Sequence, residues 1–387
     1  MQIYQINVDN FKSLLNFELK LSKFSCLIGL NGSGKSTVLQ LFDFLAQQFN
    51  GDISGWLVQK HWSAIELNSR LSNKSNIDFT VKLTHEGMDI EWHASFNRKL
   101  LRCTKERITW NNNLLLNVKD GRYSVYGLPN PHTEQNLFNS DISFSYQGSI
   151  LSQLKEEQLP DELYLLKKFS RQIYALDMLS PELLRQRTRE SRGTLGIGGE
   201  KFSAFLHELG VEKRQQLTDK LKKVYPQLKF IDSKSLRSGW KQMNISEVFG
   251  GRSISTEARH INDGLLRMMA VFAQLASSEG FMLLDEIENG INPVLIEFLL
   301  DSLVESSLQV LITTHSPVIL NYLDDSIAKD GIVYLYKTDL GSTKAVRFFD
   351  IPSMKKKLEV MGPGEVYEDT ILNELSSEIM TMNQDIS

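Results

Sequence analysis

The stretch from Gly29 to Thr37, "GLNGSGKST", constrains the fold of this 387-residue chain more than any other feature. It matches the pattern GxxxxGK[ST], in which glycines let the backbone wrap a polyphosphate. A continuous apolar run, "FSCLIGL", leads into it, and the amphipathic pattern "STVLQLFDFLAQQF" follows. Because a buried strand, a glycine-rich loop and a helix in this order form a phosphate site, the stretch predicts an α/β fold that binds nucleotides.

The side chains of this loop have distinct expected tasks. Lys35 should reach the β and γ phosphate oxygens of ATP, and the Ser36 hydroxyl should be a ligand of Mg²⁺. ATP and Mg²⁺ are therefore the expected cofactors. The residues expected to contact the nucleotide here are Gly29, Asn31, Gly32, Ser33, Gly34, Lys35, Ser36 and Thr37.

Two other apolar runs also end in polar residues. "FMLLDE" ends in Asp285 and Glu286, and "LQVLITTHS" ends beside His315. Ligands of open α/β sheets bind at the carboxyl ends of the strands, so we expect both ends to contribute to the nucleotide site. Asp285 is expected to face the metal, and Glu286 to orient or deprotonate the attacking water. His315 is expected to contact the γ-phosphate.

The segment "RHINDGLLRMMAV", from Arg259 to Val271, has two interpretations. Its apolar residues recur at helical spacing, and Asn262 is a good N-cap, as in an ordinary core helix. The same helix start could also be the half of an ATP site that one subunit offers to another, with Gly264 allowing a phosphate close to the helix N-terminus.

Changes in composition and periodicity divide the chain. The pattern predicts a mixed central sheet flanked by helices, interrupted by an antiparallel β insert and a helical subdomain. The expected parts are 1–50 (first strands and phosphate loop), 51–147 (β insert), 148–240 (helical subdomain), 241–349 (second half of the ATPase head) and 350–387 (helical tail).

The formal net charge of −4 gives no overall basic surface for nucleic acid. Of the local basic segments, Glu212–Lys223 and Lys355–Lys357 are better explained as solvated helix faces. The segment Arg185–Arg192 has two interpretations, a patch that binds phosphates and a solvated face.

The protein is expected to be located in the cytosol and to have no membrane partner. No apolar run approaches the roughly 18 residues of a membrane span, and the first residues lack the plan of a signal peptide. Cys26 and Cys103 are far apart and belong to no metal-binding pattern, so both are expected to be reduced structural thiols.

Four motifs together resemble the ATP-binding cassette ATPases of the SMC/RecF/RecN group. These are the phosphate loop, "DGLLR", "LLDE" and "TTHS", in this order and with a long insert between the first two. The resemblance is strongest to the compact stand-alone members, OLD-like and RecF-like, which lack long coiled coils. "INVDNFKSL", "SPELLRQR" and "GGEKFSAFLHEL" extend the resemblance over nearly the whole chain.

The resemblance implies a head-to-tail homodimer that sandwiches two ATP molecules. A higher oligomer is an alternative that it also allows. It makes Asn262, Asp263, Gly264 and Arg267 the signature residues that contact the partner's ATP. It places the D-loop at 289–292, and it makes His315 the switch histidine. Gln147, preferred over Gln153, becomes the Q-loop ligand of Mg²⁺.

One residue departs from the pattern of this group. Serine is usual where Asn262 stands, and asparagine, which also carries an N–H donor and caps helices, could keep the contact. The departure leaves nucleotide binding intact and puts the strength of ATP-dependent closure in question.

The expected function is an ATPase whose nucleotide-driven dimerisation gates DNA or an effector, in DNA repair or defence against phage. The sequence has no nuclease motif, so a separate nuclease or toxin would be the effector. One alternative is the nucleotide-binding subunit of a transporter, which the long insert disfavours. Another is a binding module in which ATP is structural and turnover is negligible.

Overall fold

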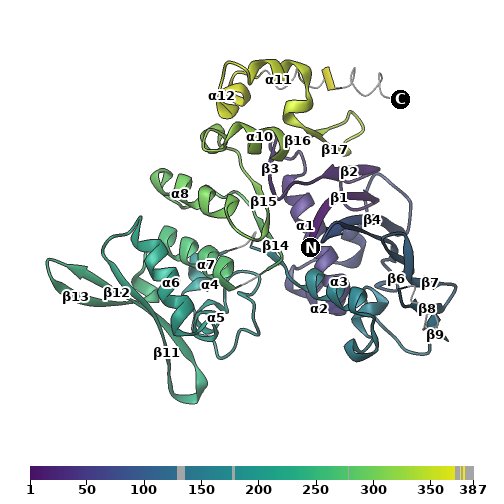
Figure 1. Cartoon of the computed structure of the whole chain (residues 1–387), viewed down its shortest axis with the longest axis horizontal. Helices are drawn as coiled ribbons and strands as arrows, with labels where there is room; N and C mark the ends of the chain where they lie inside the picture. The colour runs from purple at the N-terminus through teal and green to yellow at the C-terminus, as the bar shows by residue number, and fades with distance from the viewer. Residues whose placement is uncertain (129–135, 177–178, 278, 371–374, 376–377, 380–387) are drawn as a thin grey trace. The chain divides into compact units, whose positions relative to one another are not determined.

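The computed structural model describes residues 1–387 apart from 129–135, 177–178, 278, 371–374, 376–377 and 380–387 (Figure 1). The chain forms two compact units. Unit 1 comprises Met1–Ile173, Ser326–Val360 and Asp369–Ser387, and unit 2 comprises Tyr174–Asp325 and Met361–Glu368.

An eight-stranded antiparallel sheet forms much of unit 1, in the order β2-β1-β4-β5-β6-β7-β8-β9. Polar and apolar residues alternate along its strands, so that β4 buries Ile77, Phe79 and Val81 on one face. The strands are β1 (Gln2–Asp9), β2 (Phe17–Lys20), β4 (Asn76–His85), β5 (Met88–Asn97), β6 (Arg102–Trp110), β7 (Asn113–Lys119), β8 (Arg122–Tyr126) and β9 (Asn136–Asp141).

Helix α1 (Lys35–Asn50) packs on the apolar face of this sheet. The ring of Phe44 lies 5.3 Å from Phe11 and 5.1 Å from Phe96, between ring centroids. Near the end of the helix, Phe49 lies 4.7 Å from Trp92. Such aromatic pairs contribute roughly 0.5–1.5 kcal/mol each beyond the burial of their area, and they fix the helix, and hence the loop before it, against the sheet.

Strand β3 (Phe24–Ile28) leads into α1 and is buried at every residue, as its continuous apolar run predicts. It pairs in parallel with β16 (Ile332–Lys337), which pairs antiparallel with β17 (Thr343–Arg347). Unit 1 also contains the helices α2 (Ile53–Gln59), α3 (Asp161–Arg171) and α11 (Pro352–Lys357). Helix α10 (Asp325–Gly331) belongs to unit 1 except for its first residue.

Unit 2 contains two parallel strands, β14 (Phe281–Leu284) and β15 (Gln309–Thr313), which pair from Phe281 with Gln309 onwards. Both strands are buried throughout. Helices α7 (Asp263–Ser277) and α8 (Pro293–Val304) contact each other through Phe272 and Phe298, with ring centroids 5.5 Å apart. The short helices of this unit are α4 (Pro181–Leu184), α9 (Pro317–Leu320) and α12 (Pro363–Glu368).

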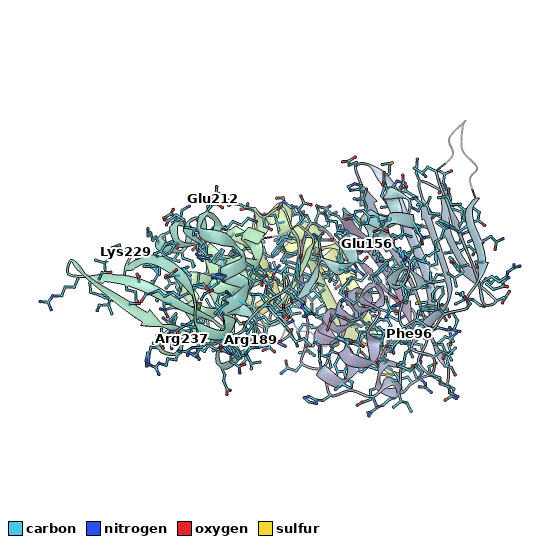
Figure 2. The ribbon with its side chains drawn as sticks, turned by 90° about the horizontal axis from the view of Figure 1, so that it is seen from below. Phe96, Glu156, Arg189, Glu212, Lys229 and Arg237 are labelled. Atoms are coloured by element: carbon cyan, nitrogen blue, oxygen red, sulfur yellow. The ribbon has the colours of Figure 1, made fainter. Side chains whose placement is uncertain are left out.

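A three-stranded antiparallel sheet completes unit 2, with α5 (Phe202–Glu208) and α6 (Gly210–Lys222) packed on it (Figures 1 and 2). The sequence predicts a helical subdomain over 148–240, whereas the structure contains strands there as well. These are β10 (Ile173–Ala175) and β11 (Leu228–Ser235), and β11 continues the sheet with β12 (Lys241–Phe249) and β13 (Arg252–Glu257). No helix within the described ranges is long and apolar enough to span a bilayer.

Candidate functional site

The phosphate loop connects β3 to α1 and has the backbone of an anion cradle. Gly29, Gly32 and Gly34 have φ values of 143°, 76° and 114°, which residues with a side chain rarely adopt. Lys35 is only 6% exposed, and its Nζ donates to Gly29 O at 2.8 Å and to Leu30 O at 3.1 Å. A helix N-terminus and a lysine folded over a glycine-rich turn can together hold a polyphosphate.

The loop rests on a buried hydroxyl from β17. Thr343 is 0% exposed, and its Oγ1 donates to Ser33 O at 2.9 Å. The Ser13 hydroxyl lies 2.8 Å from the same Oγ1, and Thr343 N donates to Ser13 O at 2.9 Å. A Cβ on Gly34 would lie 2.5 Å from this Oγ1, so only glycine fits between α1 and Thr343. Neither Ser13 nor Thr343 was among the expected site residues.

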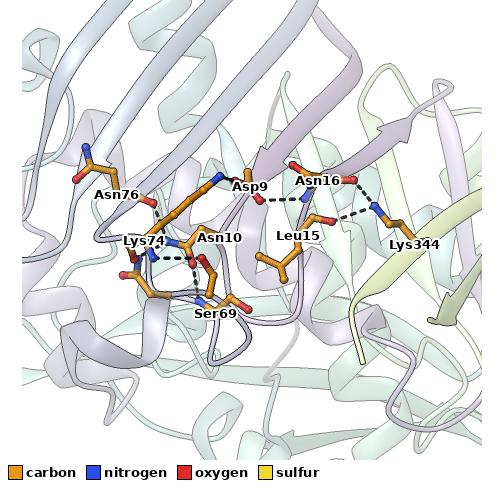
Figure 3. Close-up of polar contacts among 10 residues, drawn as sticks. Asp9, Asn10, Leu15, Asn16, Ser69, Lys74, Asn76 and Lys344 are labelled. Atoms are coloured by element: carbon orange, nitrogen blue, oxygen red, sulfur yellow. Dashed lines mark hydrogen bonds and ion pairs between the residues drawn. The ribbon is translucent and has the colours of Figure 1, made fainter. Parts of the chain in front are cut away.

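The turn after β1, which carries Ser13, is itself tied down by polar contacts (Figure 3). Asp9 accepts hydrogen bonds from Asn16 N at 3.0 Å and from Lys74 Nζ at 2.5 Å. Burial acts to raise the pKa of Asp9, but the bonds from Lys74 and the backbone outweigh it and lower the pKa. Asn10 donates to Lys74 O at 2.9 Å, and Lys344, next to Thr343, donates to Asn16 O at 2.5 Å. Hydrogen bonds therefore connect the segments that support the phosphate loop.

A pocket of about 400 Å³ lies beside the loop, and Thr37 belongs to both. In its wall, Lys12 Nζ lies 3.2 Å from the centroid of the Trp62 ring and donates to Gln40 Oε1 at 2.7 Å. Burial lowers the pKa of Lys12 to about 8. An aromatic ring and mixed polar groups suit a purine base and its ribose. The lining residues are Lys12, Ser13, Thr37, Trp62, Glu66, Asn68, Arg70, Leu71 and Gly341.

Gln147, the expected Q-loop ligand, does not lie near Ser36. Its Oε1 accepts from Ser54 N at 2.8 Å, and the following residues meet the end of α1, where Ser149 N donates to Gln48 O at 2.8 Å. Ser36 is in the first turn of α1, and with a rise of 1.5 Å per residue the two ends are about 18 Å apart. Gln153 is no better, since it lies beside Gly51. The structure corrects this assignment.

In unit 2, Asp285 and Glu286 follow β14 directly and share one hydroxyl from the end of β15. Thr313 Oγ1 donates to Asp285 Oδ1 at 2.5 Å and accepts from Glu286 N at 2.8 Å. Glu286 has a φ of 45°, an unusual value for a residue with a side chain. His315 Nε2 lies 3.7 Å from Glu286 Oε1, and Asn289 Nδ2 donates to Glu286 Oε2.

This arrangement brings three of the expected residues together, namely Asp285, Glu286 and His315. The side chain of Glu286 is 44% exposed, so a water molecule can reach its carboxylate. A cavity of about 370 Å³, lined by Asp285, Glu286, Arg267 and apolar residues, opens beside the pair. A carboxylate next to a histidine at a strand end can orient water and accept its proton.

The expected signature segment begins α7. Asn262 Oδ1 accepts from Leu265 N at 2.8 Å, so its side chain caps the helix. Gly264 packs against the D-loop region, because a Cβ there would lie 2.7 Å from Gly290 O. Arg267 Nη1 donates to Asn289 O at 2.8 Å. The segment and the D-loop region are therefore joined by the Arg267 side chain and by the close approach of Gly264 to Gly290.

The side chain of Arg185 contacts the start of the signature segment. Its Nη2 donates to Ile261 O at 2.7 Å and to Asp263 Oδ1 at 2.5 Å. Arg185, the first arginine of the segment 185–192, therefore braces the start of α7. Asp263, expected to contact nucleotide, is occupied by this ion pair and has a side chain that is 60% exposed.

The buried strand, the cradle-shaped loop and the helix define a P-loop protein with a mixed α/β fold of the SMC/RecF-like, ABC type. The structure is similar to an SMC head bound to the C-winged helix domain of ScpA, with a TM-score of 0.56 and 15% identity over 89% of this chain and 97% of that one. It is also similar to an SMC head with an extended coiled coil, bound to the C-terminal domain of ScpA derived from Pyrococcus furiosus, with a TM-score of 0.51 and 12% identity over 92% and 99%. These likenesses concern the fold.

The chain belongs to the AAA_21 family, described as "AAA domain, putative AbiEii toxin, Type IV TA system", whose model matches residues 24–321. The match includes the phosphate loop, the signature segment, the acidic pair and His315. A structure of the recombination mediator protein RecF-ATPrS in the RecFOR pathway matches at 12% identity and a TM-score of 0.47 over 89% of this chain and 98% of that one. Curated proteins gave no match to the chain.

Proposed function

We propose that the chain binds ATP at the phosphate loop and hydrolyses it. The observation that carries this proposal is the buried Lys35, whose Nζ is folded onto Gly29 O and Leu30 O at the N-terminus of α1. Burying an ammonium group is costly unless charged or polar partners surround it. The β and γ phosphates of ATP provide anionic partners for this ammonium group, and the α1 N-terminus favours the same anion.

The nucleoside would occupy the pocket that contains Trp62 and Thr37. Its volume of about 400 Å³ falls within the range of small-molecule sites. The Trp62 ring can stack on a base, while Lys12, whose pKa is lowered by burial, regains a favourable environment next to an anionic ligand. This assignment supports a nucleotide rather than inorganic polyphosphate as ligand.

Hydrolysis is assigned to Glu286 as the group that orients and deprotonates water, with His315 beside it. The resemblance to the SMC/RecF/RecN group makes Ser36 and Asp285 the proposed ligands of Mg²⁺, and each offers the hard oxygen donor that this ion prefers. The bound ion would neutralise charge on the phosphates. Thr313 orients Asp285 for this task by donating to Oδ1.

ATP-driven dimerisation is the proposed output, with the segment from Asn262 to Arg267 offered to the partner's nucleotide. The resemblance to the SMC/RecF/RecN group supports this assignment. The partner that responds would be a separate nuclease or toxin, or DNA, in DNA repair or defence. The toxin–antitoxin wording of the family description fits an effector that a nucleotide switch controls.

A second candidate is a binding module in which ATP is structural and turnover is negligible. It is favoured by Asn262, whose Oδ1 is already used as a helix cap. If the amide nitrogen cannot replace the usual serine hydroxyl at the partner's γ-phosphate, closure would be weak.

Nucleotide binding and steady-state hydrolysis test the proposal and separate the candidates. Lys35→Ala should lose most of its ATP affinity because the charge facing the β and γ phosphates is removed. Glu286→Gln should bind ATP normally and hydrolyse it at least about 100-fold more slowly. Unchanged ATP affinity in Lys35→Ala would contradict the site. If the wild type binds ATP but hydrolyses it no faster than Glu286→Gln does, the binding module with structural ATP is the better candidate.

A further inference from the structure

We infer that unit 2 carries a site for single-stranded nucleic acid at the hairpin between β11 and β12. The site is a basic–aromatic patch made of Arg187, Arg189, Arg237, Trp240 and Lys241. This inference deepens the DNA part of the proposed function and does not depend on ATP hydrolysis.

Two segments that are distant in sequence form the patch. Lys241 N donates to Thr188 O at 2.8 Å, so the chain around Thr188 runs beside the start of β12. Arg187 and Arg189 flank this bridge, and Arg237 lies in the adjacent hairpin turn. Figure 2 shows Arg189 and Arg237 on the same side of unit 2, away from Glu212 on α6.

The hairpin holds an aromatic ring at the surface. Trp240 is 40% exposed, although tryptophan is usually well covered. Leu236 N donates to Trp240 O at 2.7 Å, and Ser238 and Gly239 turn the chain with φ values of 62° and 80°. The backbone of Trp240 is therefore fixed. The guanidinium of Arg189 lies 5.1 Å from its ring centroid and steadies the indole by a cation–π contact.

The charge around this ring is positive in a chain whose net charge is −4. Arg187 is 3.9 Å from Glu257, but Arg259 approaches the same carboxylate oxygen more closely, at 3.3 Å. Lys241 Nζ donates to Ser235 Oγ, a neutral partner. Most of the positive charge in the patch therefore remains available to an anionic ligand.

An exposed ring among cations selects the ligand class. Single-stranded nucleic acid offers unpaired base faces for stacking and a phosphate at every nucleotide. A duplex hides its base faces within the stack, and an acidic peptide would use the cations without the ring. The combination of Trp240 with Arg189 and Arg237 therefore favours a single strand.

The test is fluorescence anisotropy with a labelled oligothymidylate, with the same strand in a duplex, and at a series of salt concentrations. The single strand should bind more tightly than the duplex. Trp240→Ala should weaken its binding by about 5- to 160-fold, because stacking contributes roughly 1–3 kcal/mol per base. Trp240→Phe should restore most of the loss. Arg237→Ala should make the salt slope shallower by about 0.7.

Two matched controls come from the same sheet. Phe249, at the end of the β12–β13 hairpin, is 46% exposed, and Phe249→Ala should leave binding unchanged. Lys229→Ala, on β11 outside the patch, should keep the salt slope of the wild type. Tighter binding of the duplex, equal affinity of Trp240→Ala, or displacement by polyglutamate as strong as by oligothymidylate would overturn the inference. ATP affinity measured on the same samples reports separately on the phosphate loop.

Discussion

Replacing Thr343 by valine tests how the phosphate loop is held. Valine keeps the shape of the side chain and its preference for β17, but it removes the Oγ1 that donates to Ser33 O at 2.9 Å. Ser33 O and the Ser13 hydroxyl then lose their partner in a place where Thr343 is 0% exposed. Leaving a buried polar group unsatisfied costs about 1–3 kcal/mol.

Part of this cost should appear in nucleotide binding, because the bound loop must adopt one conformation. If half or more of the penalty falls on the ATP-bound state, the Kd for ATP rises by about 2.3- to 160-fold. AMP lacks the β and γ phosphates that the loop holds, so its Kd should change far less. Equilibrium binding of ATP and of AMP, with thermal unfolding in parallel, measures both effects.

Matched variants separate a positioning role from a purely structural one. Thr343→Ser keeps the hydroxyl and should restore ATP affinity. Thr338→Val removes a hydroxyl from the same hairpin, where Thr338 Oγ1 and Ser342 Oγ lie 2.8 Å apart, and should leave ATP affinity unchanged. A Thr343→Val protein with a lower melting temperature but an ATP affinity within about twofold of the wild type would refute the reasoning.

Three further outcomes are expected. Glu286→Gln should elute from gel filtration as a dimer in ATP and as a smaller species without it, because the base that ends the ATP-bound state is lost; one elution volume in both conditions would contradict the sandwich. Asn262→Ser should increase ATP turnover and dimerisation if the amide is a poor substitute for the hydroxyl, and no change in either would reduce Asn262 to a helix cap. Glu106, which is 2% exposed, has a pKa raised from 4.5 to about 7 by burial, against hydrogen bonds from Ser149 and Ile150. Because the folded state then holds the proton more tightly than the unfolded chain, the free energy of unfolding should fall as pH rises from about 4.5 to about 7. Glu106→Gln should flatten this part of the curve in denaturant titrations, and an unchanged slope would show that another group titrates there.

The phosphate loop could be predicted from the sequence because one continuous segment forms it. The phosphate loop follows from glycines whose φ values allow the turn and from a strand and helix on either side. Gln147 was misplaced because sequence spacing does not tell which end of α1 a distant residue meets. The strands β11 and β12 were missed because polar residues such as Asp232 and Asn244 interrupt their apolar pattern.

The supporting roles of Thr313 and Thr343 could not be predicted for a different reason. Thr313 and Thr343 each lie in a strand, are 0% exposed, and use one hydroxyl to donate to one group and accept from another. Thr313 binds Asp285 and the backbone of Glu286 in unit 2, while Thr343 performs the equivalent task for Ser33 in unit 1. In a strand pattern, threonine and valine carry the same signal, since both are β-branched and of similar volume.

Only the structure distinguishes the two residues, through the partner atoms that would be left unsatisfied. The difference between threonine and valine matters for function at position 313, because the backbone of the neighbouring Glu286 is strained. A residue with a φ of 45° costs on the order of 1 kcal/mol or more, so surrounding bonds must hold it. The bond from Glu286 N to Thr313 supplies one of them and leaves the carboxylate directed at His315. The geometry of the proposed base therefore depends on the hydroxyl of Thr313, whose contact with the backbone of Glu286 cannot be read from the motif that contains it.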